Sequence, residues 1–333
     1  MTISELFSST LLAFWYRRDR PAGTKPARRA GMLRKLLAVA LPVSASALAG
    51  NLLSSANTVL VPQRLMASGM PQSEAVGALG VALGMALPLF LLPMAFVGPL
   101  VMVMLPRLSE GCATGAMDGV HRRMGKALYA VGLIALPVVA ALAPIGQPVC
   151  RLLYGQELPP DYLLILAAAM VFTYYQIVTA GMLNGTGLQS RAMMSTIIGD
   201  VLQLAITWFT VANPAIGIYG FLWGMLLGAA LSAALNFIWL IQKKGFRVQW
   251  ARWIAQPWLA AAVTGLTTHN IFSLTQGLGW ADLPSMAWAM AAGALACLLC
   301  LKIQGVRFGE YLRQLVPKKL SVAPAYGFHW FYF

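Results

Sequence analysis

A row of polar side chains follows one face of an otherwise apolar segment in the second half of the chain. Thr196, Asp200, Gln203 and Thr207 are spaced i, i+4, i+7 and i+11, which places them on one side of an α-helix. Hydroxyl, carboxylate and amide groups inside a membrane usually face protein or a water-filled cavity, where they can bind a polar ligand. Asp200 is therefore a candidate for a role in such a cavity, and the alternative is a buried structural hydrogen bond.

Two further apolar segments carry polar side chains in the same manner, one near residues 44–64 and one near 173–184. Such rows predict one hydrophilic cavity shared by three segments, although serine and threonine within membrane spans often serve helix packing alone. In the first segment, five polar residues fall in an arc of about 100°, with Asn57 and Arg64 on an adjoining side. The candidate cavity residues are Asn51, Ser55, Asn57, Thr58, Arg64, Thr173, Gln176, Asp200, Gln203 and Thr207.

The remaining reactive side chains give no pattern typical of a metal centre, a cofactor site or an enzyme. Cys297 and Cys300 are separated by two residues but lie inside an apolar run, where small residues serve helix packing, and the three histidines are scattered. An intramembrane enzyme would need paired acids or a histidine at one membrane face. The acids outside the spans are isolated on short connections, so we expect neither an enzyme nor a bound cofactor or metal.

The elements that must position these residues are membrane-spanning helices. The chain has 333 residues, of which 59% are hydrophobic and 10% charged, with a mean hydropathy of +0.70. An apolar run needs about 20 residues to cross a bilayer, and backbone groups in lipid require a helix. We therefore predict an all-α polytopic membrane protein with eight spans. They are expected at residues 36–61, 77–105, 127–145, 162–183, 192–212, 215–241, 253–273 and 284–301.

The lysines and arginines indicate the orientation of these spans. If the chain crosses at each predicted span, 22 of the 24 lie on one side, and only Arg64 and Arg151 lie on the other. An excess of positive charge marks the cytoplasmic side of a membrane protein. This places residues 17–35 and the tail from 304 in the cytoplasm. It also accounts for the net charge of +14 without a nucleic-acid partner.

Several stretches of the chain resemble the polysaccharide-biosynthesis family that includes stage V sporulation protein B. That family belongs to the superfamily of multidrug extrusion (MATE-like) proteins and lipid-linked oligosaccharide flippases. The resemblance covers about residues 1–303. The stretches are ALPVSASALAGNLLSSANTVLVPQRL at 40–65, GMALPLFLLPMAFVGPLVMVMLPRLSE at 84–110, RRMGKAL at 122–128, CRLLYG at 150–155 and GMLNGTG at 181–187.

The resemblance implies a domain organisation. Family members look like fourteen-span proteins, with two six-helix lobes around a central cavity and two extra C-terminal helices. By that pattern, residues 1–35 hold the end of a truncated span and a basic linker, and 36–242 form the second lobe. Residues 243–303 would be the two additional helices, and 304–333 a cytoplasmic tail. The first lobe would be absent from this chain.

The resemblance also implies a function. The chain would belong to a flippase of the bacterial plasma membrane that moves a lipid-linked saccharide by alternating access, inactive by itself. A cation-coupled multidrug exporter and a non-transporting structural subunit are the alternatives. The expected partners are membrane lipids, the lipid-linked saccharide, and either a separately encoded first lobe or a second copy. Arg64 would bind a phosphate or pyrophosphate of the substrate, or else anchor the chain among lipid head groups.

Overall fold

A computed structural model describes residues 2–18, 32–155 and 158–305, and every regular element within these ranges is a helix. The expectation of an all-α chain is therefore confirmed for the described residues. The greater part of the basic linker and nearly all of the tail at 304–333 lie outside them, so the expectations for those segments stay predictions.

The chain divides into two compact units, Met1–Leu41 and Pro42–Phe333. The first unit holds α1 (Thr2–Arg18) and the first turns of α2 (Met32–Ala67), and the second holds the rest of α2 and all later elements. The boundaries expected near residues 242 and 303 lie inside the second unit and stay predictions. In chain order, the elements after α2 are α3 (Gln72–Gly80), the π-helical turn η1 (Val81–Ala86), α4 (Leu87–Phe90), α5 (Met94–Ala113), α6 (Met117–Tyr154), α7 (Pro160–Gly185), α8 (Gln189–Thr210), α9 (Tyr219–Lys244), the π-helical turn η2 (Ala251–Ala255), α10 (Gln256–Gly277) and α11 (Asp282–Ile303).

Seven helical segments in the described ranges are long and apolar enough to cross a membrane, and the chain is a multi-pass membrane protein. The segment expected as one span at 77–105 overlaps two of the seven, Gln72–Phe90 and Met94–Ala113, which are separated by a turn at residues 91–93. Pro88 precedes this turn and Pro93 is its last residue. A proline both removes an amide donor and clashes with the preceding helical turn. Helices α2 and α10 occupy two other expected spans but are not among the seven.

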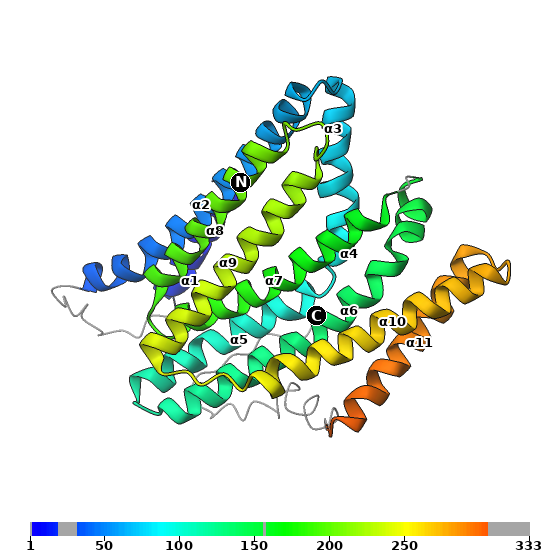
Figure 1. Ribbon diagram of the computed structural model, residues 1–333. Coiled ribbons are helices and arrows are strands. Elements are labelled where there is room, and N and C mark those ends of the chain that lie inside the picture. Colours follow the sequence, from blue (N-terminus) through cyan, green and yellow to red (C-terminus); the bar gives the residue numbers. More distant parts are fainter. Residues whose placement is uncertain (1, 19–31, 156–157, 306–333) are drawn as a thin grey trace. The chain divides into compact units, whose positions relative to one another are not determined.

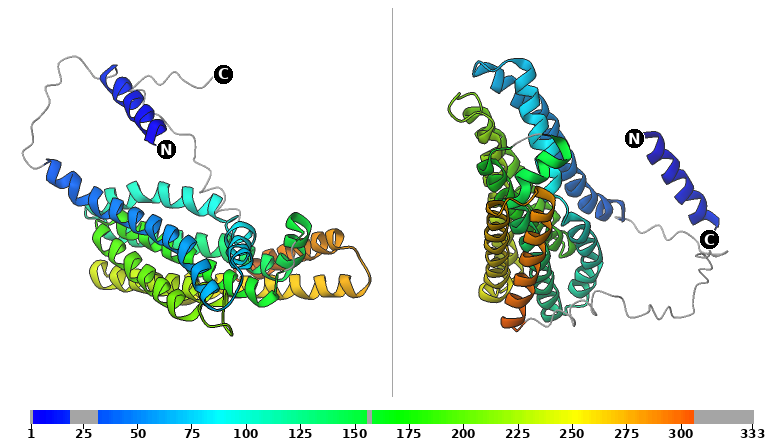
Figure 2. Two further views of the ribbon diagram at one scale, coloured as in Figure 1. Left: turned by 90° about the horizontal axis from the view of Figure 1, so that it is seen from above. Right: turned by 90° about the vertical axis from the view of Figure 1, so that its right-hand side faces the viewer.

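The centre of the second unit is formed by α6 and α7. In the most apolar stretches of these helices 61% and 56% of the residues are buried, against 22% in α5, α8 and α11. Helix α7 packs against α5, α6 and α9, and α8 packs along α9 (Figure 1). An antiparallel pair, α10 and α11, lies beside α6, as the views in Figure 2 also show.

Helices α8 and α9 approach each other closely because small residues meet at their contact. A methyl group added at Gly199 would lie 1.9 Å from Ser232 Oγ and 2.5 Å from the backbone oxygen of Gly228. Membrane helices gain no hydrophobic free energy by leaving lipid for one another, so close backbone packing between small residues supplies much of their association. Gly199 and Gly228 thus fix α8 against α9 and set the direction in which the polar side chains of α8 point.

The connection between α9 and α10 is anchored on the first turns of α6. Phe246 is 1% exposed and stacks on Trp253 at a centroid distance of 5.7 Å and an angle of 8°. His121 of α6 donates from Nε2 to the backbone oxygen of Lys244 at 2.9 Å. Gly125 leaves the space that the Trp253 ring occupies, since a methyl group there would lie 2.3 Å from that ring. The α10–α11 pair is therefore held to the other helices by a packed connection.

Candidate functional site

The polar residues of α2 lie on an outward face of the helix. Asn51, Ser55 and Thr58 are exposed, and Thr58 Oγ1 donates to the backbone oxygen of Ser54 at 2.9 Å, within its own helix. Asn57 is the exception, because it is 5% exposed and its Oδ1 has no hydrogen-bond partner in the described part of the chain. The sequence thus identified a polar face that the described helices leave uncovered.

The polar row of α8 divides between two surroundings. Gln203 and Thr207 lie at the contact with α9, where a methyl group at Gly224 would be 3.0 Å from Gln203 O and from Thr207 Oγ1. Thr207 Oγ1 donates to Gln203 O at 2.8 Å. The surroundings of these two residues match a role in helix packing, which is the alternative to a cavity. Thr196 and Asp200, which lie earlier on the same helix, are half-buried.

Asp200 carries a buried carboxylate oxygen, Oδ2, that has no hydrogen-bond partner among the described residues. A structural hydrogen bond, the alternative weighed from the sequence, is therefore not found for this oxygen in the described part of the chain. An unpaired buried acceptor inside a membrane is costly, and such groups mark polar cavities or ion pathways. Asp200 thus keeps the properties expected of a cavity residue.

The candidates on α7 contact α9 through a residue that the sequence reasoning missed. Asn236 of α9 is fully buried, and its Nδ2 donates to Thr179 Oγ1 at 3.1 Å and to the backbone oxygen of Gln176 at 3.3 Å. Asn236 Oδ1 has no partner among the described residues. Among the described residues, Thr173 bonds only within its helix, to the backbone oxygen of Ala169. The sequence could have indicated Asn236, because it is the one side-chain amide in the apolar run 215–241.

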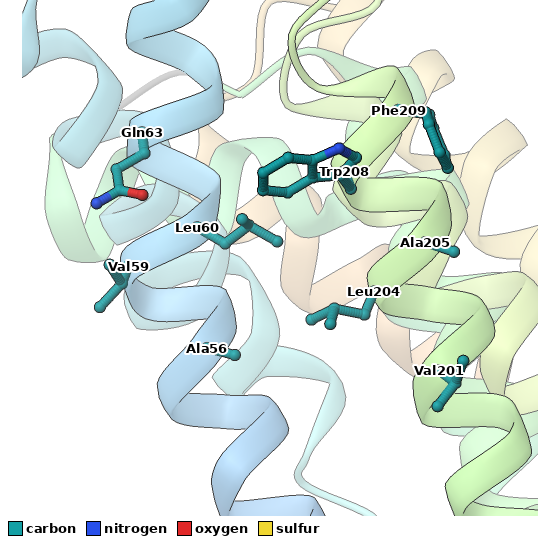
Figure 3. A pocket seen from close by; sticks show the side chains of 9 residues that line it. All are labelled: Ala56, Val59, Leu60, Gln63, Val201, Leu204, Ala205, Trp208 and Phe209. Atoms are coloured by element: carbon teal, nitrogen blue, oxygen red, sulfur yellow. The ribbon is translucent and has the colours of Figure 1, made fainter.

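A groove runs between α2 and α8. It has a volume of about 480 Å³ and is lined by Ala56, Val59, Leu60, Gln63, Val201, Leu204, Ala205, Trp208 and Phe209. In Figure 3, Leu60, Leu204 and Trp208 point into the space between the two helices. The groove is apolar apart from Gln63 and the indole nitrogen of Trp208, so it differs in character from the hydrophilic cavity that the sequence predicts.

Arg64 lies at the end of this groove and is fixed against α8. Its Nε donates to the backbone oxygen of Trp208 at 3.0 Å, and its guanidinium carbon lies 4.3 Å from the centre of the Trp208 ring. Both contacts restrain the orientation of the guanidinium group. Neither contact was foreseen, because residues 64 and 208 are far apart in the sequence.

Several charged side chains near the ends of the helices have defined contacts, while the orientation expected from the sequence stays a prediction. Arg123 of α6 donates to the backbone oxygen of Arg107 of α5 at 2.7 Å, and Arg191 of α8 lies over the ring of Trp239 of α9. Basic residues near the ends of α5, α6, α8 and α9 thus take part in contacts between these helices. At the other end of α6, Arg151 forms an ion pair with Asp282. Within the described ranges, no group of three or more His, Cys, Asp or Glu residues could hold a metal ion.

Comparison with curated proteins finds two distant relatives, both from Bacillus subtilis (strain 168). Stage V sporulation protein B is 25% identical over 202 residues, which cover 61% of this chain and 39% of that protein. Sporulation protein YkvU is 22% identical over 204 residues, covering 61% of this chain and 46% of that protein. The match therefore spans less than half the length of either relative. No protein-family profile and no solved structure matches the chain.

Proposed function

We propose that this chain forms one lobe of a membrane transporter that moves a lipid-linked saccharide between the two leaflets by alternating access. The observation that carries the proposal is the outward polar face of α2, in a multi-pass membrane protein distantly related to two sporulation proteins. Hydroxyl and amide groups suit the many hydroxyls of a saccharide head group. Asn51, Ser55 and Thr58 would contact that head group.

Alternating access needs a second bundle opposite this wall, because the substrate site of such transporters lies between two bundles that rock against each other. Polar side chains facing lipid are also unfavourable. The polar face of α2 is therefore expected to be covered by a companion polypeptide with six further spans, or by a second copy. Both relatives extend well beyond the matched segment, which leaves room for a second bundle in proteins of their length.

A cation-coupled exporter is the second candidate function. The buried Oδ2 of Asp200, without a described hydrogen-bond partner, favours it because a carboxylate in a span is a common site of cation or proton coupling. The two functions predict different cargo, so efflux of a cationic dye separates them from movement of a saccharide lipid.

Reconstitution into lipid vesicles tests the proposal. A fluorescent lipid-linked saccharide is placed in both leaflets, and its accessibility to an impermeant quencher is followed with time. We expect no movement by this chain alone and rapid movement with the companion.

Movement of the lipid-linked saccharide should fall at least tenfold in Asp200→Leu and in the triple variant Asn51→Leu, Ser55→Leu, Thr58→Leu. The control Leu52→Ala, at an exposed apolar position of α2, should be neutral. Unchanged movement in both polar variants would remove these residues from the site, and movement by the chain alone would contradict the two-bundle proposal.

The proposed orientation places the cation-rich end of the helices in the cytoplasm. Ser73, after the turn that follows α2, and Gln249, in the α9–α10 connection, are exposed at opposite ends. In a background without the four native cysteines, Ser73→Cys should react with an impermeant thiol reagent in intact cells, whereas Gln249→Cys should react only after permeabilisation. The reverse pattern would invert the proposed topology.

A further inference from the structure

The guanidinium group of Arg64 is held in one orientation yet keeps free donors. Its Nε is used by the backbone oxygen of Trp208, and its plane is placed by the indole ring. The two terminal nitrogens have no hydrogen bond or ion pair with any described residue. A guanidinium group presents its donors in a fork that matches the oxygens of a phosphate. Arg64 is thus prepared to bind an anion of that shape beside Trp208.

The apolar groove begins at the same tryptophan. Trp208 both contacts the guanidinium group of Arg64 and lines the groove, which continues along α2 past Leu60 to Ala56 (Figure 3). The groove is open on its outer side, where Val59 is 57% exposed, Val201 61% and Phe209 77%. Exposed apolar side chains of this kind suit contact with acyl chains, because lipid tails are as apolar as leucine. A cationic group and an apolar groove therefore meet at Trp208.

This groove lies on a different side of α2 from the polar residues proposed to contact the saccharide. At 100° per residue, the centre of the face with Ala56, Leu60 and Gln63 is about 140° from the centre of the face with Asn51, Ser55 and Thr58. The occupant of the groove is consequently expected to come from the surrounding bilayer and not from the cavity between the two bundles.

We propose that the groove between α2 and α8 binds one acyl chain of a membrane phospholipid, whose phosphate is hydrogen-bonded by Arg64. The phosphate accepts from the terminal nitrogens of Arg64, and Trp208 occupies the level of the head groups, where tryptophan is enriched in membrane proteins. An acyl chain gains little hydrophobic free energy by moving from the bilayer into the groove, so Arg64 supplies most of the selectivity. The bound lipid fills the space between α2 and α8, which have no extensive backbone contact with each other.

Photo-crosslinking in nanodiscs tests this site. The purified full chain carries p-benzoylphenylalanine in place of Leu60, in nanodiscs of phosphatidylglycerol and phosphatidylethanolamine, and lipid adducts are identified by mass spectrometry. The matched control carries the same group in place of Met102, a 77% exposed residue of α5. We expect at least threefold more phospholipid adduct at position 60 than at position 102. Equal yields at the two positions would overturn the proposal.

Variants of the two halves of the site sharpen the test. Arg64→Ala and Ala205→Trp, which fills the groove, should each lower the yield at position 60 to that of the control position. Arg64→Lys should retain part of the yield, and Arg151→Ala, at the same end of the helices, should retain all of it. Should Arg64→Ala fail to fold, Ala205→Trp decides alone. If an added lipid-linked saccharide displaces the phospholipid from position 60, the groove belongs to the substrate path and the proposal is wrong.

Discussion

Helices α8 and α9 pack closely at glycine residues, and hydrogen bonds join α9 to α8 and to α7. The polar face of α2, in contrast, is not covered by any other described helix. Ser232 Oγ of α9 donates to the backbone oxygen of Ser195 at 2.9 Å, and Asn236 reaches α7. On α2, the hydroxyl of Thr58 bonds only its own helix in the described part of the chain, and Ser55 is exposed. The same residue types thus join helices in one region and remain uncovered in the other, so their type alone does not reveal their role.

The largest difference between the two regions is expected for glycine substitutions. Gly199→Leu should abolish the monodisperse folded protein, because its side chain would overlap Ser232 and the backbone of Gly228. Overpacking typically costs about 1–3 kcal/mol, and here a backbone oxygen cannot rotate away. Gly50→Leu on α2, where nothing lies within 4 Å, should leave the thermal midpoint unchanged. Size-exclusion chromatography after heating checks both, and equal effects would break the comparison.

A smaller effect is expected for the hydrogen bonds between α7 and α9. Asn236→Leu should lower the free energy of unfolding by about 1 kcal/mol, since an interhelical hydrogen bond in a membrane protein is worth about 0.6 kcal/mol and at most about 1.7. Thr179→Val, which removes one of the two bonds of Asn236, should cost about half as much. Reversible unfolding in mixed micelles measures both values. A stabilised Asn236→Leu variant would instead indicate that the unpaired Oδ1 of Asn236 is retained for function.

The smallest effect on stability is expected on α2. Ser55→Leu should change the free energy of unfolding by less than about 0.5 kcal/mol, as is usual for exposed positions away from special features. The same variant, assembled with the companion lobe, should slow movement of the saccharide lipid. A Ser55→Leu variant that loses stability in the isolated chain would show that α2 is covered within this chain, and the contrast with α9 would disappear.

Part of the architecture follows from local patterns in the sequence. The length of the apolar runs predicted the helices, since a single segment in lipid must form its backbone hydrogen bonds within itself. It did not predict the turn at residues 91–93, because prolines within spans are often accommodated as kinks, and only the surrounding contacts determine whether the helix stops. Periodicity placed Gln203 and Thr207 on one face of α8, but it could not show that this part of the face meets α9.

The sequence by itself determined that this is an all-helical membrane protein, because composition and hydrophobic length are local properties. It also determined which residues share a helical face, because that depends only on spacing along the helix. The tertiary structure decided which face each neighbour covers: α9 covers Gln203 and Thr207, no described helix covers Ser55, and Trp208 holds Arg64 beside an apolar groove. Such contacts join residues distant in the sequence. They depend on the small side chains that let particular helices approach, and the periodicity of any single helix does not contain that information.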